Sequence, residues 1–366
     1  MDELLVDVPL AGRQLLSPSL ATAPCGDAVV CVPARNEAQR LPALIAGLDR
    51  QAGFGDRKVR VLLLLNNCTD ASRSTAERAA AAASRVEMRI VQRSFPAAAA
   101  HAGSARRAAM GSGAAWLDDI GARDGVLLTT DADAVPAADW VARSCAALAA
   151  GADIAAAALI GAPDEEARFA RPLRRAVDAW MEARRLAVLL EEAVDPVPGD
   201  PAPRHWDHSG GGLALRLATY RAAGGCPAMP FREDLALVEA VRRLGGIVRH
   251  CPSIRVTVSA RMQGRAAGGM ADTIRAWAAQ AEAGAPVMAP DPAVMEAQWR
   301  ARAAVRAAAA KATGHLPATL AARALAAYVA KHCPDPVDWP AEIPAPDATR
   351  ILERRLDDLL RVCPAA

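Results

Sequence analysis

The sequence has no long hydrophobic run and no excess of one charge. Its longest apolar stretch without alanine, 61–65, has the length of a strand, and no uninterrupted apolar segment reaches the roughly 18 residues of a membrane-spanning helix. The 43 basic and 41 acidic residues leave a net charge of +2, which provides no electrostatic basis for nucleic-acid binding. We therefore expect neither a transmembrane segment nor a nucleic-acid partner.

Closely spaced cysteine pairs are also missing. The eight cysteines are scattered and no C-x-x-C motif occurs, so the spacing typical of a zinc site or a disulfide framework is absent. The first ten residues carry acids where a signal peptide would carry bases. These features predict a cytoplasmic protein whose cysteines are reduced thiols.

The first 160 residues alternate between apolar strand patterns and helical patterns. Strands are predicted at 28–32, 59–65, 86–91, the start of 126–135, and 154–160. This β-α-β order predicts an α/β fold with a mostly parallel sheet covered by helices. Ligands of such sheets bind beyond the carboxyl ends of the strands, and three polar clusters lie there, at 33–37, 66–70 and 131–133.

The rest of the chain is predicted to contain longer helices and a few strands. Pro136 is expected to open a helix that reaches about residue 149, because proline suits a helix N-terminus. The later expectations are a long amphipathic helix at 163–193, a strand at 213–216, a helix at 235–244, two short strands within 247–259, and helices from about 270 to the end.

Two carboxylates, Asp131 and Asp133, end the apolar run 126–135. Carboxylates one residue apart raise each other's pKa unless a cation neutralises them. Mg²⁺ or Mn²⁺ is usually held by one or two carboxylates together with substrate phosphates. The pair therefore favours a phosphorylated substrate, and the alternative is a polar turn in which an aspartate caps the next helix.

Five motifs, in this order, resemble those of the family 2 glycosyltransferases, which have the GT-A fold. They are V-C-V-P-A-R-N-E at 30–37, N-N-C-T-D at 66–70, D-A-D at 131–133, G-G-C to R-E-D-L at 224–235, and S-A-R-M-Q-G-R at 259–265. The resemblance covers about 28–268. It predicts a GT-A domain there, preceded by an N-terminal segment at 1–27 and followed by a helical C-terminal extension at 269–366.

The resemblance implies a metal-dependent glycosyltransferase that moves a sugar from a nucleotide-diphosphate donor to an unidentified hydroxyl acceptor. Mn²⁺ or Mg²⁺ would bridge the donor diphosphate to Asp133 first and to Asp131 second, and would stabilise the charge on the leaving group. Asp131 is also expected to face the ribose or sugar. Asp234 matches the general base of inverting members, with Glu233 as the alternative, and capping of the following helix is the other interpretation of both acids.

The resemblance also assigns donor binding to residues outside the acidic pair. The nucleotide-sugar site would include Pro33, Arg35, Glu37, Asn67, Asp70, Arg106 or Arg107, Gly211, Gly212, Arg261 and Arg265. Many members have aspartate where this chain has Asn66 and Asn67, so the nucleobase stays open. Trp206 is a candidate for stacking on a sugar, and His205 and His208 for binding metal, with packing at a loop end as the alternative for all three.

Two other functions remain open at this point. A nucleotidyltransferase has a similar sheet and acidic site, but no glycine-rich G-x-G-T-R-like loop follows the first strand. A catalytically silent binding or scaffold protein is the second, and the presence of Asp131, Asp133 and Asp234 argues against it. The C-terminal extension is expected to pack on the catalytic domain, form an acceptor site or make a homodimer contact. It lacks a long basic amphipathic face for a membrane.

Overall fold

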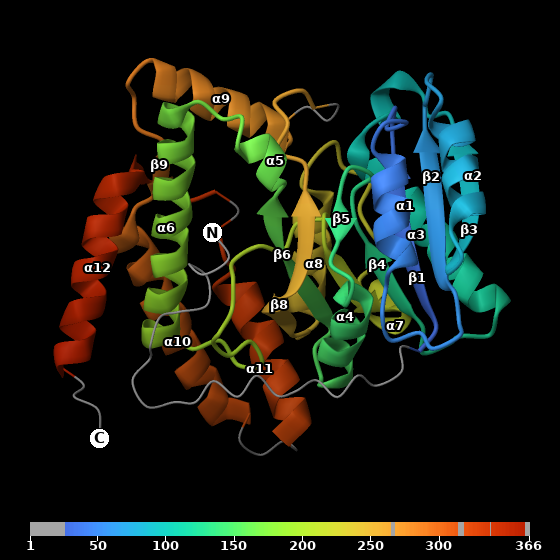
Figure 1. Ribbon diagram of the computed structural model, residues 1–366. Helices are drawn as coiled ribbons and strands as arrows, with labels where there is room; N and C mark the ends of the chain where they lie inside the picture. Colours follow the sequence, from blue (N-terminus) through green and yellow to red (C-terminus); the bar gives the residue numbers. More distant parts are fainter. Residues whose placement is uncertain (1–25, 265–267, 314–317, 337, 363–366) are drawn as a thin grey trace.

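The computed structural model describes residues 26–264, 268–313, 318–336 and 338–362. Its main feature is one eight-stranded sheet (Figure 1). The strands are β1 (Ala28–Ala34), β2 (Val59–Asn66), β3 (Val86–Arg93), β4 (Val126–Thr129), β5 (Val135–Pro136), β6 (Ile154–Gly161), β7 (Leu213–Arg216) and β8 (Val248–Val258). They lie side by side in the order β3-β2-β1-β4-β7-β6-β8-β5.

Most neighbouring strands run parallel, as the β-α-β order predicts. β1 pairs in parallel with β2 and β4, β2 with β3, and β6 with β8. β7 is antiparallel to both β4 and β6, and the short β5 is antiparallel to β8. The carboxyl ends of β1, β2 and β4 therefore lie at one edge of the sheet and bring the three polar clusters together.

Helices cover both faces of the sheet. One face packs against α1 (Leu41–Asp49), α2 (Ser72–Ala82) and α4 (Trp140–Ala149), and the other against α3 (Ala102–Asp119), α7 (Leu217–Ala222) and α8 (Glu233–Arg243). In β1, Val30 and Val32 belong to the first core, whereas Val29 and Cys31 belong to the second. Because successive side chains of a strand point to opposite faces, burial of both faces explains the unbroken apolar run.

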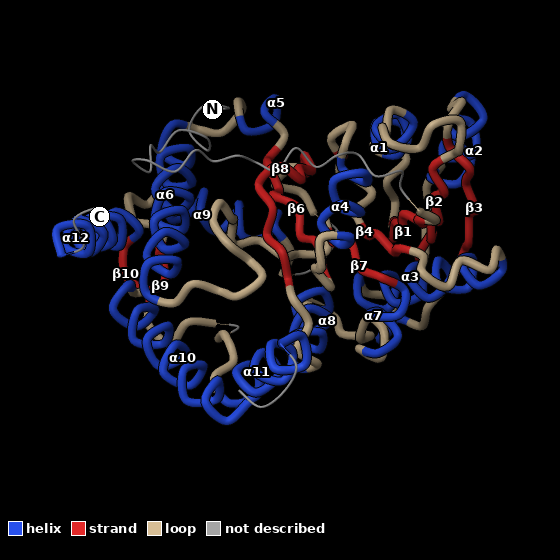
Figure 2. Tube along the Cα trace, turned by 90° about the horizontal axis from the view of Figure 1, so that it is seen from below, coloured by secondary structure: helices blue, strands red, loops and turns tan. Residues whose placement is uncertain are grey.

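The C-terminal helices pack on a long helix of the preceding region. That helix is α6 (Arg171–Val194), which contacts α9 (Met270–Glu282), α10 (Pro292–Thr313) and α12 (Ala345–Val362). α11 (Ala318–His332) follows α10 and contacts α8, so α10 and α11 together span from α6 to the sheet domain (Figure 2). α6, α10 and α12 share an apolar cluster that includes Leu186, Leu190, Trp299 and Leu352.

A buried arginine also holds α10 to the end of α6. Arg302 is 5% exposed and forms ion pairs with Glu191, Asp195 and Asp335. The attraction of these carboxylates outweighs the effect of burial, so the pKa of Arg302 is raised. Removing one partner of a buried ion pair leaves an uncompensated charge, which makes this network costly to break.

Four elements differ from the sequence-based predictions. Pro136 does not open a helix: it lies in β5 opposite Val256, and α4 begins at Trp140. The predicted helix at 163–193 is interrupted: α5 (Pro163–Glu166) ends before α6 begins at Arg171, and Pro172 lies in the first turn of α6, where proline suits a helix N-terminus.

The two short strands expected in 247–259 form the single strand β8, which has an irregular register opposite Ala157 and Ala158. Pro252, which has no N–H, lies at this irregularity and outside the regular pairing. The extension also contains a small antiparallel pair, β9 (Met288–Pro290) and β10 (Glu342–Pro344), which was not predicted.

No helix within the described ranges is both long enough and apolar enough to span a membrane. The six cysteines that fall within these ranges are free thiols.

Candidate active site

Two asparagines fix the loops that follow β1 and β2. Asn36 and Asn67 have positive φ angles of 55° and 49°, a left-handed conformation that asparagine tolerates better than most residues. Asn36 Oδ1 accepts a hydrogen bond from the Thr69 amide at 2.8 Å, which joins the two loops. The Asn67 side chain exchanges two hydrogen bonds of 2.9 Å with the backbone of Phe95. Asn67 thus anchors the loop after β3.

Asp70 also joins the first two loops. Its carboxylate accepts hydrogen bonds from Ser72 N at 3.0 Å and Ser72 Oγ at 2.5 Å, and from the Ala38 amide at 3.2 Å. Burial would raise the pKa of Asp70, but these hydrogen bonds outweigh it and lower the pKa. Nearby, Pro33 lies within β1 opposite Leu64, and Arg35 donates to the Ala100 carbonyl at 3.0 Å.

Arg106 lies at the centre of the site and joins four segments. Its guanidinium donates to Glu233 Oε1 at 2.9 Å, Thr129 Oγ1 at 2.8 Å, the Gly210 carbonyl at 2.9 Å and Asp131 Oδ1 at 2.8 Å. Arg106 and Glu233 are 5% and 4% exposed. Burial would lower the pKa of Arg106, but the nearby carboxylates outweigh it and raise the pKa. The neighbouring Arg107 donates instead to the Cys226 carbonyl at 2.8 Å.

The glycine segment before β7 leaves space for Arg106. A Cβ atom at Gly210 would lie 2.4 Å from Arg106 Cζ, which is too close for any side chain. A Cβ at Gly211 would lie 3.0 Å from Leu159 and 3.4 Å from Asp131 Oδ2, and one at Gly212 would lie 2.7 Å from Ala157 Cβ. The backbone at these glycines therefore packs closely against Arg106 and against the sheet of the same chain.

Asp133 lies between a like charge and an arginine. Arg261 Nη2 is 2.9 Å from Asp133 Oδ2 and 2.6 Å from Glu37 Oε1. Burial and the charge of Asp131 raise the pKa of Asp133 to about 6, although Arg261 opposes the shift. The ionised form of this carboxyl group is thus under-neutralised, and additional positive charge would stabilise it. Arg265 lies outside the described residues.

Asp234 is held by two backbone amides. Its Oδ2 accepts a hydrogen bond from Gly210 N at 2.5 Å, and its Oδ1 accepts one from Leu235 N at 2.8 Å. Asp234 lies next to the hydrogen bonds of Arg106, because the Arg106 guanidinium donates to the Gly210 carbonyl and to Glu233, the residue before Asp234. Glu233 is thus engaged in a buried ion pair, whereas Asp234 is half-buried and pairs with amides only.

The histidines of this region bond to one another and to the backbone. His208 Nδ1 lies 3.0 Å from His250 Nε2, and His250 Nδ1 lies 2.7 Å from Asp200 Oδ2. His205 bonds to the Ala156 carbonyl through Nε2 and accepts the Asp207 amide through Nδ1. Within the described ranges, no three His, Cys, Asp or Glu side chains are arranged to hold a metal ion.

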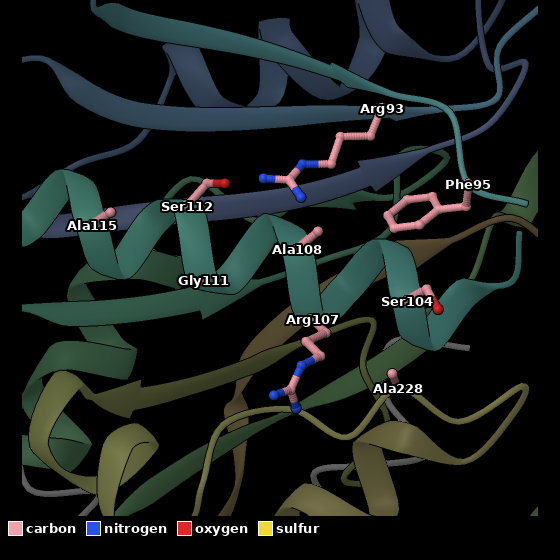
Figure 3. A pocket seen from close by; sticks show the side chains of 9 residues that line it. All are labelled: Arg93, Phe95, Ser104, Arg107, Ala108, Gly111, Ser112, Ala115 and Ala228. Carbon is pink, nitrogen blue, oxygen red and sulfur yellow. The ribbon is translucent and has the colours of Figure 1, made fainter. Parts of the chain in front are cut away.

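Two cavities lie near the site. The first has a volume of about 570 Å³ and is lined by Gln39, Arg40, Arg261, Met262, Gln263 and Gly264. Because Arg261 also contacts Asp133, this cavity adjoins the acidic pair. The second, of about 450 Å³, lies along one stripe of α3 (Figure 3). It is lined by Arg93, Phe95, Ser104, Arg107, Ala108, Gly111, Ser112, Ala115 and Ala228.

The mostly parallel sheet with helices on both faces, and two carboxylates at its carboxyl edge, is the architecture expected of the GT-A fold. Residues 29–199 match the family model described as glycosyl transferase family 2. The chain therefore carries a domain of the family 2 glycosyltransferases, and the fold class and enzyme class predicted from the five motifs are confirmed.

Solved glycosyltransferase structures show a partial similarity to this chain. The mannosyltransferase PcManGT from Pyrobaculum calidifontis, in complex with GDP-Man and Mn²⁺, has 16% identity and a TM-score of 0.47, with 92% of this chain and 76% of that chain covered. S. aureus TarS 1–349 in complex with UDP has 12% identity and a TM-score of 0.43, with 91% of each chain covered. The glucosyl-3-phosphoglycerate synthase from Mycobacterium tuberculosis, in complex with Mn²⁺, UDP and glucosyl-3-phosphoglycerate, has 16% identity and a TM-score of 0.36, with 72% of this chain and 81% of that chain covered. A search of curated proteins gives no match. At TM-scores below 0.5, these similarities do not define the ligands of this chain.

Several residues of the site were not singled out from the sequence. Thr129 bonds to Arg106, and Thr130 Oγ1 donates to the Gly211 carbonyl at 2.8 Å, so both threonines connect β4 to the glycine segment. Asn36 was recognised only as part of a motif. The one sequence signal for the two threonines is their polarity at the end of an apolar run.

Proposed function

We propose that this protein is a metal-dependent glycosyltransferase that moves a sugar from a nucleotide-diphosphate donor to a hydroxyl acceptor with inversion. The arrangement of Asp131, Asp133 and Asp234 around Arg106 and Arg261 carries the proposal. It combines an under-neutralised acidic pair, a polar cavity beside it and a carboxylate held by amides, all within a family 2 domain. We further infer that residues 28–268 form the catalytic domain and 269–366 an extension of it.

The acidic pair fits a divalent cation. Asp131 Oδ2 accepts no hydrogen bond from the described residues, and burial together with the charge of Asp131 raises the pKa of Asp133 in spite of Arg261. Two carboxylates are too few to complete a metal site, so donor phosphates would supply further ligands, as is usual for Mg²⁺ and Mn²⁺. Asp133 and Asp131 would hold the ion, which supplies charge stabilisation at the leaving diphosphate when bound.

Arg261 and the adjoining cavity favour donor binding. The guanidinium bonds to both Asp133 and Glu37, which places a fixed positive charge at the mouth of the cavity. A guanidinium presents two parallel N–H groups to a phosphate. We infer that the donor diphosphate lies between Arg261 and the acidic pair, while Asn67 and Asp70 shape the nucleotide side by holding its loops together.

Asp234 is the general base in this proposal. The amides of Gly210 and Leu235 fix its two oxygens, and each oxygen retains a lone pair for a further hydrogen bond. Asp234 takes the proton of the acceptor hydroxyl while the hydroxyl oxygen bonds to the anomeric carbon and the bond from that carbon to the diphosphate breaks. Glu233 is unsuited to the role, because its carboxylate already pairs with the buried Arg106.

Calorimetric titration of nucleoside diphosphates, with Mn²⁺ and with chelator, tests the donor site. We expect one nucleotide to bind only with metal, and Asp133→Asn to weaken its binding at least tenfold, whereas the exposed Asp164→Asn leaves binding unchanged. Absence of nucleotide binding in the folded wild type would contradict the proposal. A catalytically silent protein would bind nucleotide with metal but transfer no sugar to any acceptor.

Asp234→Asn tests the base separately. It keeps the size of the side chain, so we expect nucleotide binding to persist while the transfer rate falls by about 10²- to 10⁴-fold, the usual contribution of a general base. Proton NMR of the fresh product shows whether the anomeric configuration is inverted. Retention, or an unchanged rate in the variant, would remove Asp234 from the mechanism.

A further inference from the structure

Three tryptophans and one arginine meet between α6, α9 and the loop that precedes the glycine segment. The ring centroids of Trp180 and Trp206 are 6.3 Å apart, and those of Trp180 and Trp277 are 5.2 Å apart. Arg184 Cζ lies 5.8 Å from the ring centroids of both Trp180 and Trp206. All four residues are half-buried. They therefore form an indole-walled surface with a guanidinium on it, which we call the Trp–Arg184 cluster.

Arg184 has no bonded partner in the described part of the chain. Its Nε atom is buried without a hydrogen bond, and no ion pair to the guanidinium is formed there. Burial lowers the pKa of Arg184, although Glu191 and Asp207 oppose the shift from a distance. The adjacent Arg185, in contrast, bonds to both oxygens of Glu182. Because a guanidinium without an anionic partner is costly to desolvate, the terminal Nη groups of Arg184 are donors that a bound anion would pair with.

The Trp–Arg184 cluster adjoins the proposed base. Trp206 and Asp207 begin the segment whose Gly210 amide bonds to Asp234 Oδ2 at 2.5 Å, and Ser209 N donates to Asp207 Oδ1 at 2.8 Å. Burial raises the pKa of Asp207, and the negative charge of Asp234 raises it further. The cluster and the proposed base are therefore joined by one short segment, 206–210, with Trp206 at one end and the amide that holds Asp234 at the other.

We propose that the Trp–Arg184 cluster is the acceptor subsite, and that the acceptor is a sugar bearing a carboxylate or phosphate group. This inference rests on the function proposed above. Indole rings offer a flat apolar face on which a pyranose can stack, with little entropy to lose. The guanidinium of Arg184 would pair with the acidic group of the acceptor. The cluster would thereby bind the ring and the acidic group of the acceptor, and a hydroxyl group of the acceptor would stay free to receive the sugar.

Matched probes distinguish an acidic from a neutral acceptor. Wild-type protein saturated with Mn²⁺ and its nucleoside diphosphate is titrated calorimetrically with D-glucose, D-glucuronate and D-glucose 6-phosphate. We expect at least one acidic probe to bind roughly tenfold to a hundredfold more tightly than D-glucose, the range for a charged hydrogen bond. A preference for one acid distinguishes carboxylate from phosphate, and this comparison requires no variant.

Two variants then assign the preference to a residue. Arg184→Gln should abolish the preference for acidic probes while leaving nucleotide affinity unchanged, and Arg185→Gln, one position along α6, should alter neither. Equal binding of neutral and acidic probes, no binding of either acid, or a preference that survives Arg184→Gln would overturn the inference. If the protein binds its nucleotide in these cases, only the inference fails, whereas loss of nucleotide binding by the wild type contradicts the proposed function itself.

Discussion

The buried guanidinium of Arg106 allows a quantitative test of how the site is held together. Arg106→Met removes the partner of Glu233, which is 4% exposed and has no route to water without rearrangement. Breaking one side of a buried ion pair typically costs about 3–5 kcal/mol. We therefore expect the free energy of unfolding, measured by urea denaturation and circular dichroism, to fall by about that amount. Asp131 contributes less to this loss, because its side chain is 43% exposed and water can solvate it.

The double variant Arg106→Met/Glu233→Leu separates the charge effect from lost packing. Because it leaves no buried charge unpaired, it should recover most of the loss in spite of changing two residues. Arg221→Met is the control, since its ion pair with Asp118 has both side chains 52% exposed and should contribute less than about 1 kcal/mol. The reasoning is refuted if Arg106→Met costs no more than this control, or if the double variant is less stable than the single one.

Three further predictions follow from individual residues. Gly210→Ala should lower the free energy of unfolding by about 1–3 kcal/mol and impair transfer, because the added methyl group would displace Arg106. Gly111→Ala is the control: a Cβ atom there would meet no atom within 4 Å, so this variant should be neutral or slightly stabilising. Burial lowers the pKa of His205 to about 3, whereas the imidazole of the unfolded chain takes up a proton below about pH 6.5. The free energy of unfolding should therefore fall as the pH drops from 6.5 towards 3, by up to about 1.4 kcal/mol per pH unit. His205→Gln should flatten that dependence in unfolding experiments between pH 4 and 7, and an unchanged slope would contradict it. The thiol of Cys31 is fully buried and its pKa is raised by burial, so a thiol reagent should modify it only after unfolding, and rapid labelling of the native protein would show otherwise.

Most of the sheet was predictable because its signals are local. The strands β1 and β2 are apolar runs that must be buried on both faces, and their ends follow from the polar residues after them. The predicted strand 213–216 matches β7 residue for residue. Pro136 and Pro252 misled the prediction, because their effect depends on which strand lies beside them: β8 beside Pro136, and β6 beside Pro252. That information comes from residues about 95 to 120 positions away in the chain.

The candidate site was predictable as a set of positions, whereas its internal bonds were not. Asp131, Asp133, Asp234 and Arg261 were named from their motifs, and Arg106 from the wider family resemblance. Sequence motifs did not show that Glu233 pairs with Arg106 and Asp234 with backbone amides, a difference that separates the two candidate bases. Likewise, Gly211 and Gly212 were expected to contact the donor, but a Cβ atom at either would meet Leu159 or Ala157 of the same protein.

The sequence by itself determined the fold class, the family and the residues at the sheet edge, because hydrophobic periodicity and short motifs are properties of neighbouring residues. Only the tertiary structure decided which charges are paired. Arg106 meets Glu233 across 127 positions of sequence, Arg261 meets Glu37 across 224, and Arg184 is left without a hydrogen bond or ion pair among the described residues. Ion pairs act over a few ångströms in space and are indifferent to separation along the chain. The roles of charged residues are therefore settled only once the chain has folded.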